Sequence, residues 1–160
     1  MKPEIKKVSW EEAEKCSRKI AKWADGQKFT EILAISKGGL FPGLIVANVL
    51  EIPLEVVKAQ RKVGCSIASM LYRVRYPEYS FFLVVDDIID EGITMIEIAR
   101  MLKEQGAKFK TVSMYWKFHS RYKPDFYVKE VKSHYLVVFP WESEKNEIRK
   151  WEEWNERYPE

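Results

Sequence analysis

The sequence predicts an α/β domain: a mostly parallel, five-stranded sheet flanked by helices, with a small hood formed by the later strands. Segments of helical periodicity alternate with short apolar segments of strand length, which is typical of parallel α/β domains. Residues 81–86 (FFLVVD) are almost continuously hydrophobic, as a strand buried on both faces should be. We expect one domain over residues 1–160, with the hood at roughly 118–142 and a C-terminal helix at roughly 144–158.

Each expected element has a local signal. Ser9 and Glu12 form a capping box that opens the first helix, and Gly26 ends it. Apolar spacing predicts three further helices, at residues 41–50, 93–105 and 144–158. Strands are expected at residues 31–36, 54–58, 81–86, 110–116 and 134–139.

Composition and charge limit the classes of partner. Of the 160 residues, 46% are hydrophobic and 32% charged, and no apolar run reaches the roughly 20 residues that span a bilayer. The basic N-terminus lacks the apolar segment of a signal peptide. A net charge of +3 suits a small polyanion at least as well as nucleic acid. We therefore expect a cytoplasmic protein with small-molecule substrates, no nucleic acid and no membrane.

Three acids follow the most apolar strand. Asp86, Asp87 and Asp90 are followed by Gly92 and Thr94, and then by a helix. The carboxyl end of a parallel strand is where open α/β sheets bind ligands, and free N–H groups at a helix N-terminus suit a phosphate. The alternative is a solvated turn with a helix cap, because acids are common in turns.

This segment resembles the phosphoribosyl-pyrophosphate motif of type I phosphoribosyltransferases, and ten of its eleven positions fit. The exception is Glu91, where the family usually has Thr. The resemblance implies the fold of that family, ribose binding by Asp86 and Asp87, and proton transfer at the purine by Asp90 as the catalytic residue. It also implies that one turn holds the sugar phosphate, namely Asp90, Glu91, Gly92, Ile93 and Thr94.

Two further segments concern the pyrophosphate. Residues 35–43 are similar to the pyrophosphate loop of the purine branch, which implies binding by Ser36, Lys37, Gly38 and Gly39 and allows a cis peptide after the basic residue. The alternative is a plain strand-to-helix turn. Residues 59–80 correspond to the family's mobile flap, where Arg73 and Arg75 suit pyrophosphate oxygens or form a charged solvent face.

The base site is expected near two later strands. Lys117 ends a strand where 6-oxopurine enzymes of the family have a lysine, and an ammonium donates to O6 of an oxopurine but has no acceptor for the amino group of adenine. The segment around Tyr135 is similar to the one that stacks on the base, with Leu136 as the alternative position. The resemblance also implies that Asp87 binds Mg²⁺ and that Glu142 helps to hold a second Mg²⁺. Solvation for Lys117 and core packing for Tyr135 are the alternatives.

The resemblance, which is closest to short xanthine–guanine phosphoribosyltransferases, predicts a purine-salvage enzyme that is a homodimer or homotetramer. The expected reaction transfers the phosphoribosyl group of phosphoribosyl pyrophosphate to guanine, xanthine or hypoxanthine and releases pyrophosphate. A second hypothesis is a non-catalytic regulator of the same fold that binds nucleotide or RNA, suggested by Glu91. A third is a response-regulator-like receiver domain, which also uses paired acids and a lysine at a strand end, but whose acids follow different strands.

Overall fold

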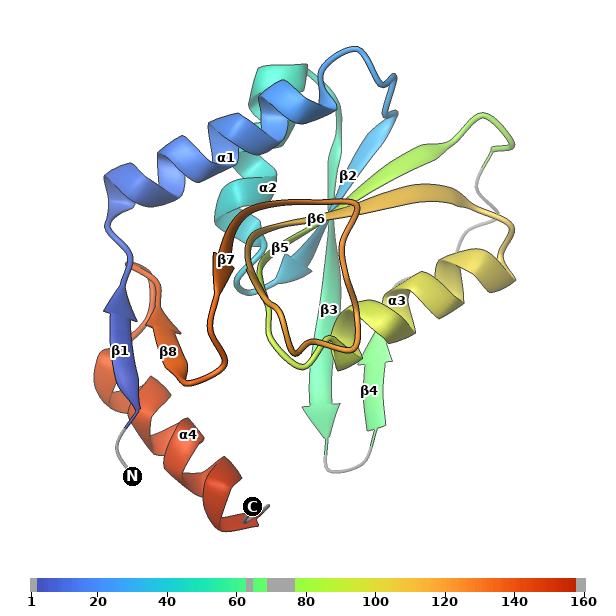
Figure 1. Ribbon diagram of the computed structural model, residues 1–160. Helices are drawn as coiled ribbons and strands as arrows, with labels where there is room; N and C mark the ends of the chain where they lie inside the picture. Colours follow the sequence, from blue (N-terminus) through green and yellow to red (C-terminus); the bar gives the residue numbers. More distant parts are fainter. Residues whose placement is uncertain (1–2, 63–64, 69–76, 158–160) are drawn as a thin grey trace.

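The structure is a computed structural model that describes residues 3–62, 65–68 and 77–157 (Figure 1). Helices and strands alternate along most of the chain, as the sequence pattern predicts. In chain order the elements are β1 Glu4–Lys7, α1 Trp10–Ala24, β2 Glu31–Ser36, α2 Leu40–Leu50, β3 Leu54–Lys62, β4 Cys65–Ala68, β5 Phe81–Ile89, α3 Ile93–Glu104, β6 Lys108–Lys117, β7 Phe126–Val131, β8 Tyr135–Val138 and α4 Glu144–Arg157.

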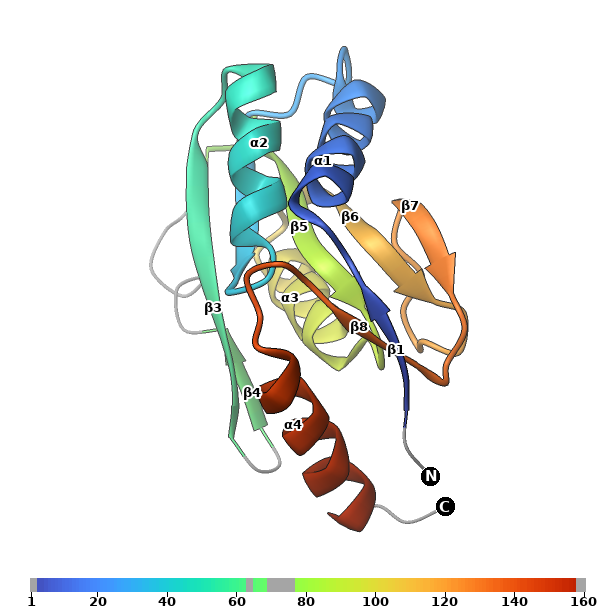
Figure 2. The ribbon, with the colours of Figure 1, turned by 90° about the vertical axis from the view of Figure 1, so that its left-hand side faces the viewer.

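The main sheet has the strand order β4-β3-β2-β5-β6-β7. The five strands β3, β2, β5, β6 and β7 run parallel, and β4 adds a short antiparallel strand at the β3 edge. Helices α1 and α2 cover one face and α3 covers the other (Figure 2). The predicted fold class, a mostly parallel five-stranded sheet flanked by helices, is therefore confirmed.

A separate two-stranded sheet lies beside the main one. In it β1 pairs in parallel with β8, with Glu4 opposite Tyr135 and Lys7 opposite Val138. The region 118–142, expected as the hood, divides between the two sheets, because β7 joins β6 in the main sheet and only β8 pairs with β1. The helix α4 follows directly and packs beside β8 (Figure 2).

The capping residues explain where α1 begins. The Ser9 hydroxyl accepts a hydrogen bond from the backbone N–H of Glu12 at 3.1 Å, which satisfies one of the free donors of the first turn. The side chain of Glu12 then accepts from the Tyr115 hydroxyl at 2.5 Å and pairs with Lys129. This links α1 to β6 and β7 on the face that carries the larger hydrophobic cluster. No helix among the described residues is both long and apolar enough to cross a membrane.

Candidate active site at the carboxyl ends of the parallel strands

The ends of β2 and β5 bring the first two predicted motifs into contact. These strands are parallel neighbours, so their carboxyl ends lie at the same edge of the sheet. A Cβ on Gly38 would lie 2.1 Å from Oδ2 of Asp87, and a Cβ on Gly39 would lie 2.3 Å from the carbonyl of Val85. Both turn positions therefore require glycine, because any side chain would displace the acid motif from the turn.

The turn after β2 contains a cis peptide bond between Ser36 and Lys37. The resemblance placed such a bond one residue later, after Lys37, so that detail is corrected. The backbone N–H of Gly39 donates to the carbonyl of Ile35 at 2.7 Å, which closes the turn just before α2. Lys37 is exposed at this edge of the sheet, where its ammonium is accessible to an anion.

The two neighbouring acids of β5 differ in burial, because Asp87 is buried and Asp86 is half-buried. Their side chains interact, and the backbone N–H of Asp87 donates to Oδ1 of Asp86 at 2.9 Å. Asp87 is buried, and Ile88 donates its backbone N–H to Oδ1 at 2.7 Å. Burial raises the pKa of Asp87 to about 6, against the lowering effect of this hydrogen bond.

Glu142 belongs to the same side of the site. Its Oε2 accepts the backbone N–H of Phe139 at 2.9 Å, which holds the carboxylate inward. The pKa of Glu142 is raised to about 7, first by burial and then by the negative charges of Asp87 and Glu147. The hydrogen bond from Phe139 and the positive charge of Lys150 oppose this rise. Two desolvated carboxylates that repel each other are a donor set of hard oxygens, so Asp87 and Glu142 fit the Mg²⁺ that the family uses.

The turn between β5 and α3 is the segment predicted to bind the sugar phosphate. Gly92 has a φ of 82° at the N-cap of α3, and a Cβ there would lie 2.6 Å from Ser120 Oγ. The backbone N–H of Ile96 donates to the carbonyl of Gly92 at 2.9 Å. The N–H groups before it, in the first turn of α3, have no carbonyl partner within an α-helix. Ile93 and Thr94 belong to that turn.

Asp90 and Lys117 form an ion pair. Lys117 Nζ lies 2.8 Å from Oδ2 of Asp90 and 3.5 Å from the carbonyl of Ser133. The lysine side chain is only 8% exposed, whereas that of Asp90 is 47% exposed. The predicted catalytic acid and the predicted selector of the base therefore lie in contact, beside the segment that leads into β8.

The structure differentiates the two residues considered for base stacking. Tyr135 packs against the hydrophobic cluster that contains Val137, and its ring lies 4.5 Å from that of His134. A hydrogen bond to Glu4 raises the pKa of Tyr135, so its hydroxyl is engaged with β1. Leu136 alternates to the opposite face of β8. This arrangement favours Leu136 over Tyr135 as the residue that faces a bound base.

Some residues fall outside these contacts. Arg73 and Arg75 lie outside the described residues.

His119, which sequence reasoning missed, lies 3.4 Å from both Asp90 and Glu91, and the ligand atoms of the three lie within 4.8 Å of one another. Three such ligands can hold a metal, but the carboxylate of Asp90 already contacts the ammonium of Lys117. No motif marked His119, because its partners Glu91 and Asp90 are 28 and 29 residues away in the sequence.

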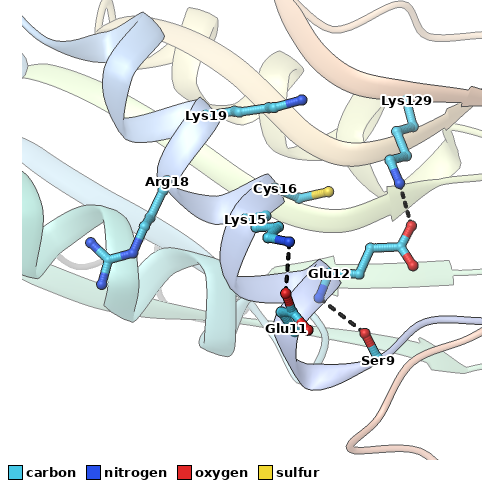
Figure 3. Close-up of a pocket in the computed structure, with 8 residues that line it drawn as sticks. All are labelled: Ser9, Glu11, Glu12, Lys15, Cys16, Arg18, Lys19 and Lys129. Atoms are coloured by element: carbon cyan, nitrogen blue, oxygen red, sulfur yellow. Dashed lines mark hydrogen bonds and ion pairs between the residues drawn. The ribbon is translucent and has the colours of Figure 1, made fainter.

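A hollow of about 500 Å³ lies elsewhere, beside α1 and β7 (Figure 3). None of the predicted site residues lines it. Its charges are largely paired, because Lys15 binds Glu11 and Lys129 binds Glu12 (Figure 3). It is a surface depression between paired charges, and the candidate active site remains the edge formed by β2, β5 and β6.

Comparisons with known proteins identify the family of this chain. Residues 6–147 match the model of the phosphoribosyl transferase domain. The curated xanthine–guanine phosphoribosyltransferase of Idiomarina loihiensis is 30% identical over 149 residues, covering 84% of this chain and 85% of that protein. The crystal structure of a purine phosphoribosyltransferase from Pyrococcus horikoshii has the same fold, with a TM-score of 0.77 at 24% identity, covering 87% of this chain and 95% of that one.

A second solved structure, the xanthine–guanine–hypoxanthine phosphoribosyltransferase of Helicobacter pylori, has a TM-score of 0.74 at 18% identity. It covers 91% of this chain and 99% of that one, so the shared fold extends over nearly the whole molecule. The family match includes both turns predicted to bind phosphate and the strand that ends at Lys117. The chain therefore belongs to the phosphoribosyltransferase family, and its curated relatives are xanthine–guanine phosphoribosyltransferases.

Proposed function

We propose that this protein transfers the phosphoribosyl group of phosphoribosyl pyrophosphate to a 6-oxopurine and releases pyrophosphate. The observation that carries the proposal is the contact between Lys117 and Asp90, 2.8 Å apart, next to the turn that opens α3. One side chain offers only donors and the other, when ionised, only acceptors. A 6-oxopurine presents the matching groups, an acceptor at O6 and a nitrogen-bound proton at N7 in one tautomer.

The reaction exchanges one bond at C1 of the ribose for another. The bond from C1 to the pyrophosphate oxygen breaks, and its electron pair leaves with pyrophosphate. The N9 lone pair of the purine forms the new bond to C1, and the proton on N7 passes to Asp90. General-base assistance of this kind contributes about 100- to 10,000-fold in rate. The hydrogen bond from Lys117 to O6 orients the base for this attack.

Binding of the sugar phosphates is assigned to the two turns. The N–H groups of the first turn of α3, including Ile93 and Thr94, suit the 5′-phosphate. Lys37 and the backbone of Gly38 suit the pyrophosphate. Asp87 and Glu142 would hold Mg²⁺, which neutralises the charge of the leaving group when bound. The ribose hydroxyls are assigned to Asp86 and Asp87.

The base is assigned as guanine, xanthine or hypoxanthine in purine salvage. Lys117 has no acceptor for the amino group of adenine, so adenine loses the contact that an oxopurine gains. The names of the curated relatives support the same class of base. The regulator hypothesis is not favoured, because Glu91, which motivated it, has a partner in His119. We place the reaction in the cytoplasm.

We also propose that the protein is a homodimer or homotetramer. Helix α2 is apolar on nearly all sides, and it exposes Leu40, Leu44 and Val49. Near its N-terminus, the half-exposed Trp10 contacts the ring of Phe41 at 5.3 Å. Apolar residues grouped in this way are typical of subunit contacts. Sedimentation at micromolar concentration tests this, and a monomer would contradict it.

The test of the reaction is direct. The protein is incubated with phosphoribosyl pyrophosphate, Mg²⁺ and one base at a time, and nucleotide and pyrophosphate are quantified. We expect product with at least one 6-oxopurine, a rate at least about 100-fold lower with adenine, and no product in excess chelator. Absence of nucleotide with all three oxopurines would overturn the proposed function, and full activity in chelator would overturn the metal assignment.

A further inference from the structure

The connection between β6 and β7 wraps around the phosphate turn. The backbone N–H of Arg121 donates to the carbonyl of Glu91 at 3.2 Å. A Cβ on Gly92 would lie 2.6 Å from Ser120 Oγ and 2.8 Å from the backbone nitrogen of Tyr122. Residues 118–122 therefore press directly on the turn that is assigned to the 5′-phosphate.

One side chain of this connection contacts both acids of the turn. His119 Nε2 lies 3.4 Å from Oδ1 of Asp90 and 3.4 Å from Oε1 of Glu91. The side chains of His119 and Glu91 are about equally covered, at 29% and 30% exposed. Because an imidazole with its proton on Nε2 donates there whether it is neutral or charged, it can hydrogen-bond either carboxylate in both states.

Glu91 is the one position of the phosphate motif that departs from the family pattern. A carboxylate free to approach the 5′-phosphate would repel it, and this repulsion is strong at short range. In the structure the carboxylate is instead engaged with His119, on the side of the β6–β7 connection. His119 thus supplies a partner for the carboxylate of Glu91, the residue that departs from the family pattern.

We propose that His119 is a positioning residue that keeps the carboxylate of Glu91 away from the 5′-phosphate and steadies Asp90 opposite Lys117. This inference rests on the proposed function for its kinetic consequences. Through Glu91, His119 governs affinity for phosphoribosyl pyrophosphate. Through Asp90, whose other oxygen contacts Lys117 at 2.8 Å, it governs the chemical step. The two effects are separable because they pass through different carboxylates.

The experiment is a double-mutant cycle between the two positions. His119→Ala should raise KM for phosphoribosyl pyrophosphate about tenfold and lower kcat about threefold, because contacting residues couple by such amounts. Glu91→Thr alone should lower this KM about twofold, because it removes a negative charge from the turn assigned to the 5′-phosphate. In the double variant KM should return to within about threefold of the original, while kcat stays low. His119→Gln, which keeps an N–H donor, should retain most of both parameters.

Additive effects on KM, or a His119→Ala variant that behaves like the original protein, would overturn the proposal. The control is Lys15→Ala, which removes an exposed ion pair with Glu11 on α1 and should change neither parameter. A general loss of folding would lower activity without rescue by Glu91→Thr, so rescue distinguishes positioning from folding.

A second measurement does not depend on activity. Amide hydrogen exchange of residues 86–96 without substrate should be several-fold faster in His119→Ala than in the original protein or in Lys15→Ala. Unchanged exchange would count against the contact. If the original protein makes no nucleotide, the proposed function fails, and this measurement still decides whether His119 holds the turn.

Discussion

The candidate active site has two halves that treat their carboxylates differently. In the paired half, Asp90 contacts the ammonium of Lys117 and the imidazole of His119. In the acid half, Asp87 and Glu142 are desolvated and lie within the influence of each other's negative charge, and the pKa of each is raised. Asp87 lies in β5 and Asp90 directly follows this strand, whereas Glu142 comes from the segment between β8 and α4.

The difference indicates what each half is ready to receive. In the paired half, Asp90 already has Lys117 and His119 as partners. This half can therefore bind a neutral base by exchanging internal contacts for contacts with O6 and N7. The acid half holds buried carboxylates whose charge is costly, and a cation would relieve that cost. A metal–pyrophosphate complex brings such a cation. The halves thus match the two substrates of the proposed reaction.

Removing the charge of Asp90 should have the largest effect and would break the paired half. Asp90→Asn keeps the shape of the side chain but no longer accepts the N7 proton. We expect kcat to fall by about 100- to 10,000-fold, with affinity for phosphoribosyl pyrophosphate within a few fold. Single-turnover kinetics and calorimetric binding measure the two quantities. A near-normal kcat would show that Asp90 is only a turn residue.

The next effect is expected at the other member of the same contact. Lys117→Ala removes a charged hydrogen bond to O6, so kcat/KM for oxopurines should fall by about 10- to 100-fold. KM for phosphoribosyl pyrophosphate should change much less, since this substrate lies at the turns. Steady-state kinetics with each substrate varied in turn decide the point. Equal losses for both substrates would contradict the assignment.

The acid half is probed through its metal requirement. Glu142→Gln keeps the acceptor for Phe139 N–H but removes one negative charge. We expect the Mg²⁺ concentration for half-maximal activity to rise about three- to tenfold, with kcat at saturating Mg²⁺ nearly restored. Activity titrated with Mg²⁺ at fixed substrate measures this. An unchanged Mg²⁺ requirement would remove Glu142 from the metal site.

The smallest effect concerns stability and pH. The pKa of Asp87 is raised from 3.8 to about 6, so the folded state binds its proton more tightly than the unfolded state. Stability should therefore fall as pH rises from about 4 to above 6. Asp87→Asn has no carboxyl group to ionise, so it avoids this loss of stability. In the presence of chelator, the Tm of the variant should match that of the original protein at pH 4 and exceed it by about 5 °C at pH 8. A Tm difference that does not change with pH would contradict the raised pKa of Asp87.

Local signals made most of the fold predictable. Ser9 and Gly26 marked α1, and the apolar residues before Asp86 marked the central strand. Strand β4 was missed; it has only four residues, Cys65–Ala68. Strands β1 and β7 were also missed, since their sequences EIKK and FYVKEV mix charged and apolar residues without clear alternation. Their pairing with β8 and β6 is decided by contacts between distant parts of the chain, which local periodicity does not report.

The candidate site was predictable to a similar degree. The motif residues predicted to act together, Asp90 and Lys117, are in contact although 27 residues apart, because adjacent parallel strands carry both. The sequence did not predict that Asp87 lies under Gly38, nor that His119 contacts Glu91. Both contacts depend on how the two turns and the β6–β7 connection pack together, and no residue pattern within any one of these segments encodes that packing.

The pairing of β1 with β8 has a practical consequence. Because Glu4 lies opposite Tyr135 and Ile5 opposite Leu136, the first described residues of the chain form the lateral support of the segment assigned to the base. The main sheet is hydrogen-bonded without them. An affinity tag or a deletion at this end should therefore impair recognition of the purine before it impairs folding. Preparations that carry the tag at the N-terminus are best compared with preparations that carry it at the C-terminus.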